Sequence, residues 1–290
     1  MRPVGKHSIP RQILVLLVAL GMAGVTGCKM HRAEPVKTML SSGRFPVMVI
    51  AHRGFSGIAP ENTVIAFQKG MEAGSDMIEL DVRFSKEGEV AVIHDETLER
   101  TTSGRGKVIE KTINELKKLD AGSKFHSSFS GERIPTLREV LQLAHRQIPV
   151  NIELKIGNYE RWTISDLADR ALREVEMAGM VDQVVFSSFD PIALERVLKK
   201  NQAVPVAYLY NRPWNFPREV TEGRPFSTLT CRKSVLTAEN ISRAHQQGIR
   251  VGVYTLNMEE EMEKFIELKV DAIITDYPDR LVKFLQKRYQ

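Results

Sequence analysis

Two hydrophobic patterns alternate along the chain past residue 46. Short runs of β-branched and other apolar residues are followed by longer stretches in which apolar positions recur every three or four residues. The short runs are typical of buried strands and the long stretches of amphipathic helices, so their alternation predicts βαβ units around a parallel sheet. Strand-like runs occupy residues 47–51, 77–83, 90–94, 150–155, 184–188, 205–209, 227–231, 251–255 and 272–276. Crossover helices are expected at residues 63–73, 137–146, 164–178, 192–200, 238–247 and 258–268.

One connection is too short for a crossover helix. Residues 77–83 and 90–94 are separated by only a few residues around Ser85 to Gly88, which suits a hairpin. The remaining eight strands are then parallel, and eight βα units of this length predict an α/β fold, a closed (β/α)8 TIM-type barrel, rather than an open sheet. Residues 96–135 are longer than an ordinary loop and are expected to form a small capping insertion after the hairpin.

Polar residues interrupt two of the strand-like runs with a period of two. In MIELDV, residues 77–82, this alternation directs Glu79 and Asp81 into the barrel while the apolar residues meet the outer helices. NIELK, residues 151–155, likewise directs Glu153 and Lys155 inward. Three carboxylates inside one barrel repel one another and lose hydration, so they are costly without a cation. Oxygen ligands favour a hard divalent ion, Mg²⁺ or Ca²⁺.

Two histidines are expected beside these acids. His52 ends the first strand, adjacent to the second. If the hairpin closes through residues 85–88, Phe84 faces Glu89. His94 then lies opposite Glu79, whereas a slip of one residue would turn His94 away. The histidines and acids thus converge on one mouth of the barrel, where the catalytic residues of this fold lie.

Two cations accompany these groups and are suited to bind a phosphate: Arg53 and Lys155. Either could instead only pair with a neighbouring acid, Glu61 or Glu153. Taken singly, a histidine is commonly a hydrogen-bonded structural group, and a Glu-x-Asp is commonly a solvated edge. Their convergence at one mouth favours catalysis. Glu61 and Asn62 are expected to hold the loop after the first strand rather than to take part in the chemistry.

Motifs along nearly all of residues 47–286 support the same interpretation. In order they are AHRGFSGIAPENTVIAF, MIELDVRFSKEGEVAVIHDETLERTTSGRG, LDAG, IPTLREVL, VNIELK, SSFDP and IITDYP. Together they resemble the glycerophosphodiester phosphodiesterase family, and the resemblance is specific because the His-Arg-Gly, Glu-x-Asp, His-Asp and Glu-x-Lys elements all occur at the expected places. One departure is Tyr254-Thr255-Leu256-Asn257, where the family usually has Trp-Thr-Val-Asn; it bears on the shape of the alcohol pocket.

The resemblance implies a fold, a cofactor and a reaction. It implies a TIM-type barrel with a small insertion after the His-Asp element, a divalent metal, and hydrolysis of glycerophosphodiesters to glycerol 3-phosphate and an alcohol. In the mechanism that it implies, one histidine takes a proton from the glycerol 2-hydroxyl, which attacks phosphorus, and the other protonates the departing alcohol. Carried over residue by residue, it implies Glu79, Asp81 and Glu153 as metal ligands, His52 and His94 as the acid–base pair, and Arg53 and Lys155 as phosphate contacts. We assign His52 as base and His94 as acid, and the two could exchange roles in the second half of the cycle.

Residues 1–27 are expected to be a bacterial export signal. A basic start that ends at Arg11 precedes an apolar run, residues 13–25, that is too short to span a bilayer. Val25-Thr26-Gly27-Cys28 resembles the bacterial lipobox, so Cys28 is expected to carry the lipid of a membrane-anchored lipoprotein; the alternative is a secreted protein with a chance cysteine. Lys29 favours the outer membrane, facing the periplasm, if the cell has two membranes. Residues 28–46 are expected to be a tether, and residues 47–286 the barrel.

Composition and charge narrow the classes of function. The 290 residues are 42% hydrophobic, which excludes disordered and fibrous classes. The net charge of +5 includes three cations and no acid in residues 1–27, so the rest carries +2 with both signs mixed, and no nucleic-acid partner is expected. Cys231 is the only cysteine besides Cys28, which leaves no internal disulfide.

Two other functions stay open on the same barrel. The first is a phospholipase D-like enzyme acting on lysophospholipids, in which Tyr159, Trp162 and residues 211–217 would hold an acyl chain. The second is a catalytically silent surface binding lipoprotein. The buried acids argue against it, because a scaffold has no need to keep them.

Overall fold

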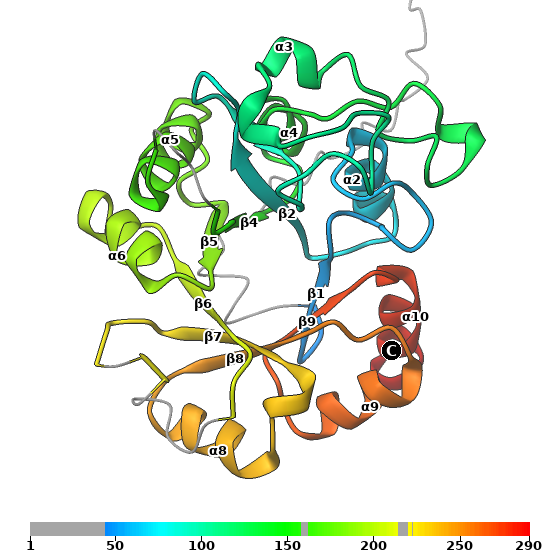
Figure 1. Ribbon diagram of the computed structural model, residues 1–290. Coiled ribbons are helices and arrows are strands. Elements are labelled where there is room, and N and C mark those ends of the chain that lie inside the picture. Colours follow the sequence, from blue (N-terminus) through cyan, green and yellow to red (C-terminus); the bar gives the residue numbers. More distant parts are fainter. Residues whose placement is uncertain (1–43, 158–161, 214–219, 222) are drawn as a thin grey trace, which may run out of the picture. The chain divides into compact units, whose positions relative to one another are not determined.

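The computed structural model describes residues 44–157, 162–213, 220–221 and 223–290 (Figure 1). The expected signal, Cys28 and most of the tether lie outside these ranges, as do Tyr159 and residues 214–217 of the aromatic loop. Among the helices that are described, none combines the length and the apolar character needed to cross a membrane.

Eight parallel strands form a closed barrel with helices around it (Figure 1). Around the ring the order is β1, β9, β8, β7, β6, β5, β4 and β2, and pairing of β1 with β2 closes it. The strands are β1 (Met48–Ala51), β2 (Met77–Phe84), β4 (Val150–Leu154), β5 (Val184–Ser188), β6 (Val206–Tyr210), β7 (Thr228–Arg232), β8 (Arg250–Tyr254) and β9 (Ala272–Thr275). The predicted (β/α)8 barrel is confirmed.

The predicted hairpin forms, but its register differs by one residue from the expected one. The antiparallel strand β3 (Val90–Val92) pairs with β2 so that Phe84 lies opposite Val90 rather than Glu89. The amide of Ser85 donates to the carbonyl of Glu89 at 2.9 Å, so the connection between the two strands contains one residue more than expected. His94 therefore lies beyond the strand and not opposite Glu79, and it reaches the mouth from the loop that follows β3.

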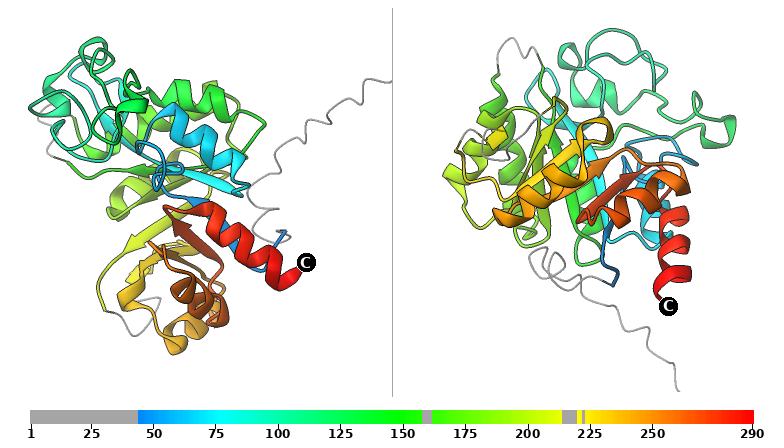
Figure 2. Two further views of the ribbon diagram at one scale, coloured as in Figure 1. Left: turned by 90° about the vertical axis from the view of Figure 1, so that its right-hand side faces the viewer. Right: turned by 90° about the horizontal axis from the view of Figure 1, so that it is seen from below.

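The helices lie close to the expected ranges and begin at defined caps. The caps of α2, α3, α4, α5 and α8 are threonines whose hydroxyls accept a backbone N–H of the first turn, and Asp190 caps α6 in the same way. The helices are α2 (Val64–Glu72), α3 (Ile113–Leu116), α4 (Leu137–Ala144), α5 (Ile164–Met177), α6 (Pro191–Lys200), α8 (Ala238–Gln246), α9 (Glu259–Glu267) and α10 (Pro278–Tyr289). The last, α10, is not among the expected helices; it packs against β1 and α9 (red in Figures 1 and 2).

Side-chain alternation along the strands separates the helix-facing core from the barrel interior. Ile78, Leu80 and Val82 of β2 are fully buried in the cluster that packs strands against helices α4, α5 and α6. Met77 points the other way and joins a small apolar cluster that fills the barrel near the strand starts. Polar residues occupy the same inward face farther along the strands, so the carboxyl ends of the strands surround a polar mouth.

Residues 95–135 form loops with three short helical turns: η1 (Val108–Glu110), α3 and η2 (Ser127–Phe129). Figure 2 shows the segment (teal to green) largely as loops, and it contains its own apolar cluster around Leu98 and Leu116. The carboxylate of Asp120 accepts from three backbone amides, those of Gly122, Ser123 and Gly131, and this fixes the second half of the segment. The insertion is therefore a folded unit attached after the hairpin.

Candidate active site

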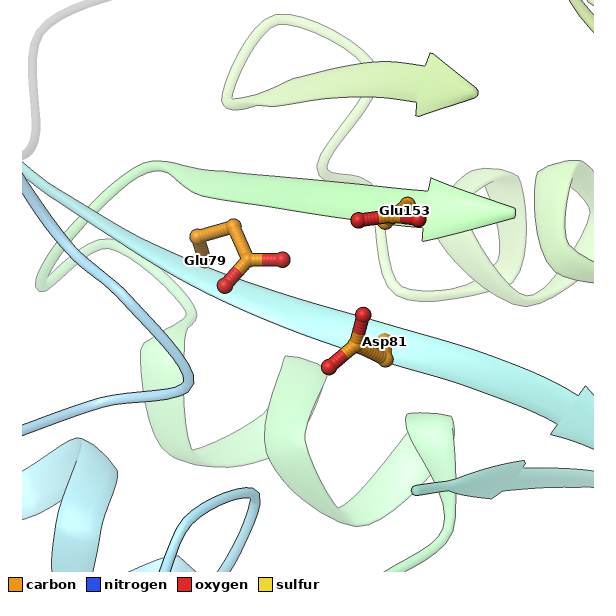
Figure 3. A group of neighbouring side chains, drawn as sticks. All are labelled: Glu79, Asp81 and Glu153. Atoms are coloured by element: carbon orange, nitrogen blue, oxygen red, sulfur yellow. The ribbon is translucent and has the colours of Figure 1, made fainter. Parts of the chain in front are cut away.

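Three carboxylates lie together inside the mouth of the barrel. β2 supplies Glu79 and Asp81 and β4 supplies Glu153, and the register places Asp81 directly opposite Glu153. Figure 3 shows the three side chains pointing toward one another, and one oxygen from each lies within 4.8 Å of the others. Glu79 and Asp81 are 2% and 1% exposed, so they have lost almost all of their hydration.

The cations of the chain do not balance this cluster when all three acids are ionised. Nζ of Lys155 lies 2.7 Å from Glu153 and 3.5 Å from Asp81, and Nε of Arg53 lies 3.2 Å from the other oxygen of Asp81. Three acids thus face two cations. Burial, reinforced by the charge of Asp81, raises the pKa of Glu79 to about 8. Burial alone would also raise the pKa of Asp81, but Arg53 and Lys155 hold it below its usual value. Without an ion, the ionised form of Glu79 is therefore disfavoured.

The loop after β1 holds this cluster through one backbone amide and one side chain. Arg53 and Asn62 both adopt the left-handed region, with φ of 55° and 58°, which non-glycine residues rarely occupy. This conformation directs the amide of Arg53 to Oε2 of Glu79 at 2.8 Å. The side chain of Asn62 donates to Asp81 at 2.8 Å and accepts from the backbone amide of Asp81 at 3.2 Å. The loop residues thus orient the acids directly.

His52 is paired with an aspartate from the far end of the chain. Ala51 lies opposite Thr275 in the β1–β9 register, so the next residues, His52 and Asp276, meet at the strand ends. Nδ1 of His52 lies 2.6 Å from Oδ1 of Asp276. Burial lowers the pKa of His52, but the bond to Asp276 and the charge of Glu79 outweigh burial and raise the pKa above its usual value.

His94 is held in the same way by its sequence neighbour. Its Nδ1 lies 2.6 Å from Oδ1 of Asp95, and Nε of Arg100 donates to the other oxygen of Asp95 at 2.5 Å. Burial lowers the pKa of His94 below its usual value, against the opposing effect of the charge of Asp81. Because Nδ1 is engaged in both histidines, Nε2 is the atom that each leaves for a substrate.

A cavity of about 270 Å³ opens beside these groups. Its lining is formed by His52, Arg53, Glu79, His94, Asn151, Glu153, Lys155, Ser187, Phe189, Leu209, Tyr254, Thr255 and Ile274. Three buried polar atoms on its wall have no hydrogen-bond partner among the described residues: Oδ1 of Asn151, Oγ of Ser187 and the hydroxyl of Tyr254. Such atoms are costly unless a ligand or water satisfies them.

The structure brings all seven residues expected at the mouth together, and it places further residues behind them. Asp81 lies behind the cavity wall, while the other six line the cavity. Sequence reasoning gave no role to Asp276, Asp95 or Arg100, although Asp95 belongs to the His-Asp element and a polar residue at the end of the last strand-like run was a usable signal for Asp276. Trp162 does not line the cavity; its ring packs on Phe84, with centroids 5.3 Å apart.

A parallel barrel whose mouth joins two carboxylate-held histidines to an acidic cluster and two cations defines a hydrolase of phosphate esters. Residues 52–280 match the Glycerophosphoryl diester phosphodiesterase family, and the chain belongs to that family.

Named relatives agree with this assignment. The glycerophosphodiester phosphodiesterase of Caldanaerobacter subterraneus subsp. tengcongensis is 39% identical over 247 residues, covering 83% of this chain and 98% of that protein. The glycerophosphodiester phosphodiesterase of Bacillus altitudinis is 35% identical, covering 82% and 98%. The structure of an Oleispira antarctica phosphodiesterase in complex with the product sn-glycerol-3-phosphate has a TM-score of 0.78 and 29% identity, covering 82% and 96%. The predicted family and enzyme class are confirmed.

Proposed function

We propose that the protein hydrolyses glycerophosphodiesters to glycerol 3-phosphate and an alcohol in a metal-dependent reaction with two-histidine acid–base catalysis. The observation that supports this most strongly is the pair of histidines, His52 and His94. Each has Nδ1 held by a carboxylate at 2.6 Å, and both line the cavity that two of the three acids and both cations also line. A carboxylate in this position orients an imidazole and stabilises its charged form.

The acids are assigned as ligands of one divalent ion, Mg²⁺ or Ca²⁺. Their oxygens are close enough to bind one ion, and Oδ1 of Asp81 accepts no hydrogen bond from a described residue. When all three acids are ionised, the cluster carries one negative charge more than Arg53 and Lys155 compensate. All-oxygen ligands suit a hard cation. When bound, such an ion supplies positive charge that stabilises the phosphoryl oxygens of the substrate. The ligand set is Glu79, Asp81 and Glu153.

Proton transfer is assigned to the two Nε2 atoms. His52 accepts the proton of the glycerol 2-hydroxyl as its oxygen attacks phosphorus, and His94 gives a proton to the alcohol oxygen as the bond from phosphorus to that oxygen breaks. Water then opens the cyclic phosphate with the two roles exchanged, which yields glycerol 3-phosphate. The raised pKa of His52 makes it the stronger proton acceptor, and the lowered pKa of His94 makes it the stronger donor.

Two cations are assigned to the phosphoryl group, Arg53 and Lys155. Both line the cavity, and each is held toward it by a carboxylate, with Arg53 Nη1 2.8 Å from Glu61 and Lys155 2.7 Å from Glu153. Guanidinium and ammonium groups fixed in advance can stabilise charge that develops on phosphoryl oxygens without reorganisation during the reaction. Pairing with neighbouring acids, the alternative interpretation of these residues, is therefore compatible with phosphate binding.

The cavity favours a small polar alcohol over an acyl chain. Asn151, Ser187 and Tyr254 present polar atoms that lack partners among the described residues, and a hydroxyl-bearing group satisfies such atoms where an acyl chain does not. The hydroxyl of Tyr254 belongs to the position at which the family usually has tryptophan. We therefore expect water-soluble glycerophosphodiesters to be better substrates than lysophospholipids.

We also propose that the mature protein is a bacterial lipoprotein anchored by lipid on Cys28, at the outer membrane facing the periplasm if the cell has two membranes. The lipobox-like Val25-Thr26-Gly27-Cys28 and the polar stretch after it support this.

An assay of purified residues 29–290 with glycerophosphocholine, glycerophosphoethanolamine and a lysophospholipid, each with and without chelator, tests the substrate and the metal together. Hydrolysis of the first two that chelator abolishes is expected. Hydrolysis of the lysophospholipid alone would favour the phospholipase D-like alternative.

A further inference from the structure

One guanidinium in the insertion contacts two carboxylates that each hold a different residue of the site. Nε of Arg100 donates to Oδ2 of Asp95 at 2.5 Å, and its two terminal nitrogens donate to both oxygens of Glu61 at 2.6 and 2.7 Å. The other oxygen of Asp95 lies 2.6 Å from Nδ1 of His94. One oxygen of Glu61 also accepts from Nη1 of Arg53 at 2.8 Å.

We propose that Arg100 is a positioning residue of the active site, which fixes the imidazole of His94 and the guanidinium of Arg53 at the same time. This inference rests on the roles proposed above for His94 and Arg53. It makes the insertion a part of the catalytic site, since a residue of the insertion aligns a proton donor and a phosphate-binding cation that reach the mouth from two different loops.

The geometry explains why Arg100 controls orientation. A carboxylate bonded on both oxygens cannot rotate, and Asp95 is bonded by Arg100 on one oxygen and by His94 on the other. Arg100 donates to both oxygens of Glu61, which fixes the orientation of this carboxylate. Glu61 then holds the guanidinium of Arg53 on one side, and Asp81 lies 3.2 Å from Nε of Arg53 on another. Without Arg100, both carboxylates gain rotational freedom, and the two residues that they hold gain it with them.

The backbone of Arg100 is itself anchored. It lies in a turn in which the amide and the hydroxyl of Thr102 both donate to the carbonyl of Leu98, at 3.1 and 2.7 Å. Leu98 and Thr102 are buried, whereas the side chain of Arg100 is 48% exposed. An exposed ion pair of this kind contributes little to stability, so its loss should lower the activity more than the stability.

The test compares Arg100→Ala with a matched control in the purified full chain. The control is Arg196→Ala, which removes an equally bidentate guanidinium–carboxylate pair, with Asp169 at 2.6 and 2.7 Å, between helices α5 and α6. We expect Arg100→Ala to lower kcat/KM for glycerophosphocholine by about 10²-fold, the effect of a small misplacement of reacting groups, with a denaturation midpoint like that of the control. Added guanidinium should restore part of the activity of Arg100→Ala only. Arg100→Lys should stay impaired, because one ammonium cannot replace the planar fork.

Parallel assays separate this inference from the proposed function. If the wild type hydrolyses the substrate and His94→Ala does not, but Arg100→Ala is as active as Arg196→Ala, the positioning role is wrong while the proposed function stands. If His94→Ala is fully active, the proposed function itself is wrong. In Arg100→Ala combined with Glu61→Gln, we expect a loss smaller than the product of the single losses, because both changes release the same residue. Strictly multiplicative losses would also overturn the positioning role.

Discussion

His52 and Asp276 lie 224 positions apart in the sequence, yet Nδ1 of one lies 2.6 Å from Oδ1 of the other. Closure of the barrel between β1 and β9 brings them together, because His52 directly follows one strand and Asp276 the other. Ser56 and Asn257 also donate to Asp276, at 3.0 and 2.6 Å, so the carboxylate itself is held in place. Asp276 in turn fixes which nitrogen of His52 is available to the substrate.

Replacing Asp276 with asparagine should therefore impair His52 without unfolding the barrel. We expect Asp276→Asn to lower turnover by roughly 10²-fold or more, because the imidazole loses its orienting anion. The bond to Asp276 raises the pKa of His52, so the limb of the pH–rate profile that His52 controls should move to lower pH. Asp271→Asn is a control, since Asp271 holds His245 at 2.8 Å and does not line this cavity. Unchanged kinetics of Asp276→Asn would show that the pair is only structural.

The roles of the two histidines can be separated by the leaving group. His52→Ala and His94→Ala should each lower turnover of glycerophosphocholine by roughly 10²–10⁴-fold, as expected for loss of a proton-transfer group. A glycerophosphodiester of nitrophenol needs no protonation of its leaving group. On that substrate His94→Ala should recover most of its activity and His52→Ala should not. Recovery of His52→Ala instead would exchange the assignments, and near-normal turnover of either variant on glycerophosphocholine would remove that histidine from the mechanism.

The pKa of Glu79 predicts how the stability of the ion-free protein depends on pH. Its folded-state pKa of about 8 lies above the usual 4.5, so the folded state keeps a proton that the unfolded chain releases. The free energy of unfolding should therefore fall as pH rises from about 4.5 to 8. The raised pKa values of Glu153 and His52 act in the same direction, and the lowered pKa of His94 opposes them.

Chemical denaturation of chelated protein at about pH 5 and pH 8 measures this effect. The decrease in the free energy of unfolding should be smaller in Glu79→Gln, because its amide side chain has no proton to lose in this pH range. A saturating divalent cation should also reduce it, since the cation stabilises the deprotonated acid. A free energy of unfolding that rises over this range in chelated wild type, with Glu79→Gln unchanged from it, would contradict the raised pKa of Glu79.

The tether can be tested apart from the catalytic site. Cys28→Ser should release the protein from membranes while its specific activity stays the same, because the expected lipid lies outside the barrel. Mass spectrometry of the N-terminus identifies any protein that keeps its signal, and that fraction is left out of the comparison. A soluble, processed variant that has lost activity would contradict a tether separate from the enzyme.

Local patterns in the sequence were enough to predict the barrel and the acids at its mouth. The period-two alternation around Glu79, Asp81 and Glu153 depends only on neighbouring residues, so it could be interpreted without the fold. The register of the hairpin could not, since it depends on how many residues the turn takes up. The contact of Arg100 with Glu61 spans 39 positions and requires the folded insertion, so sequence patterns did not indicate it.

Glu153→Gln distinguishes buried acids that hold a divalent cation from acids that serve only as ion-pair partners. The change removes one negative ligand and keeps nearly the same shape, while Lys155 retains Asp81 as a partner. The control is Glu174→Gln, which weakens the ion pair between the buried Glu174 and the exposed Arg138, at 2.9 Å on both oxygens, outside the site.

The measurement is the free energy of unfolding of both variants, with and without the cation, alongside their activity. In Glu153→Gln we expect activity to fall and metal binding to weaken, while the stability of the ion-free protein holds or rises because repulsion is relieved. In wild type the ion should add about 2.7 kcal/mol at a hundredfold excess over its Kd. Glu174→Gln should keep its activity and its response to the cation, and the stability of its ion-free form should not rise, because the change relieves no repulsion among the acids of the site. Full activity in exhaustively chelated wild type, or undiminished turnover in a destabilised Glu153→Gln, would contradict the metal site.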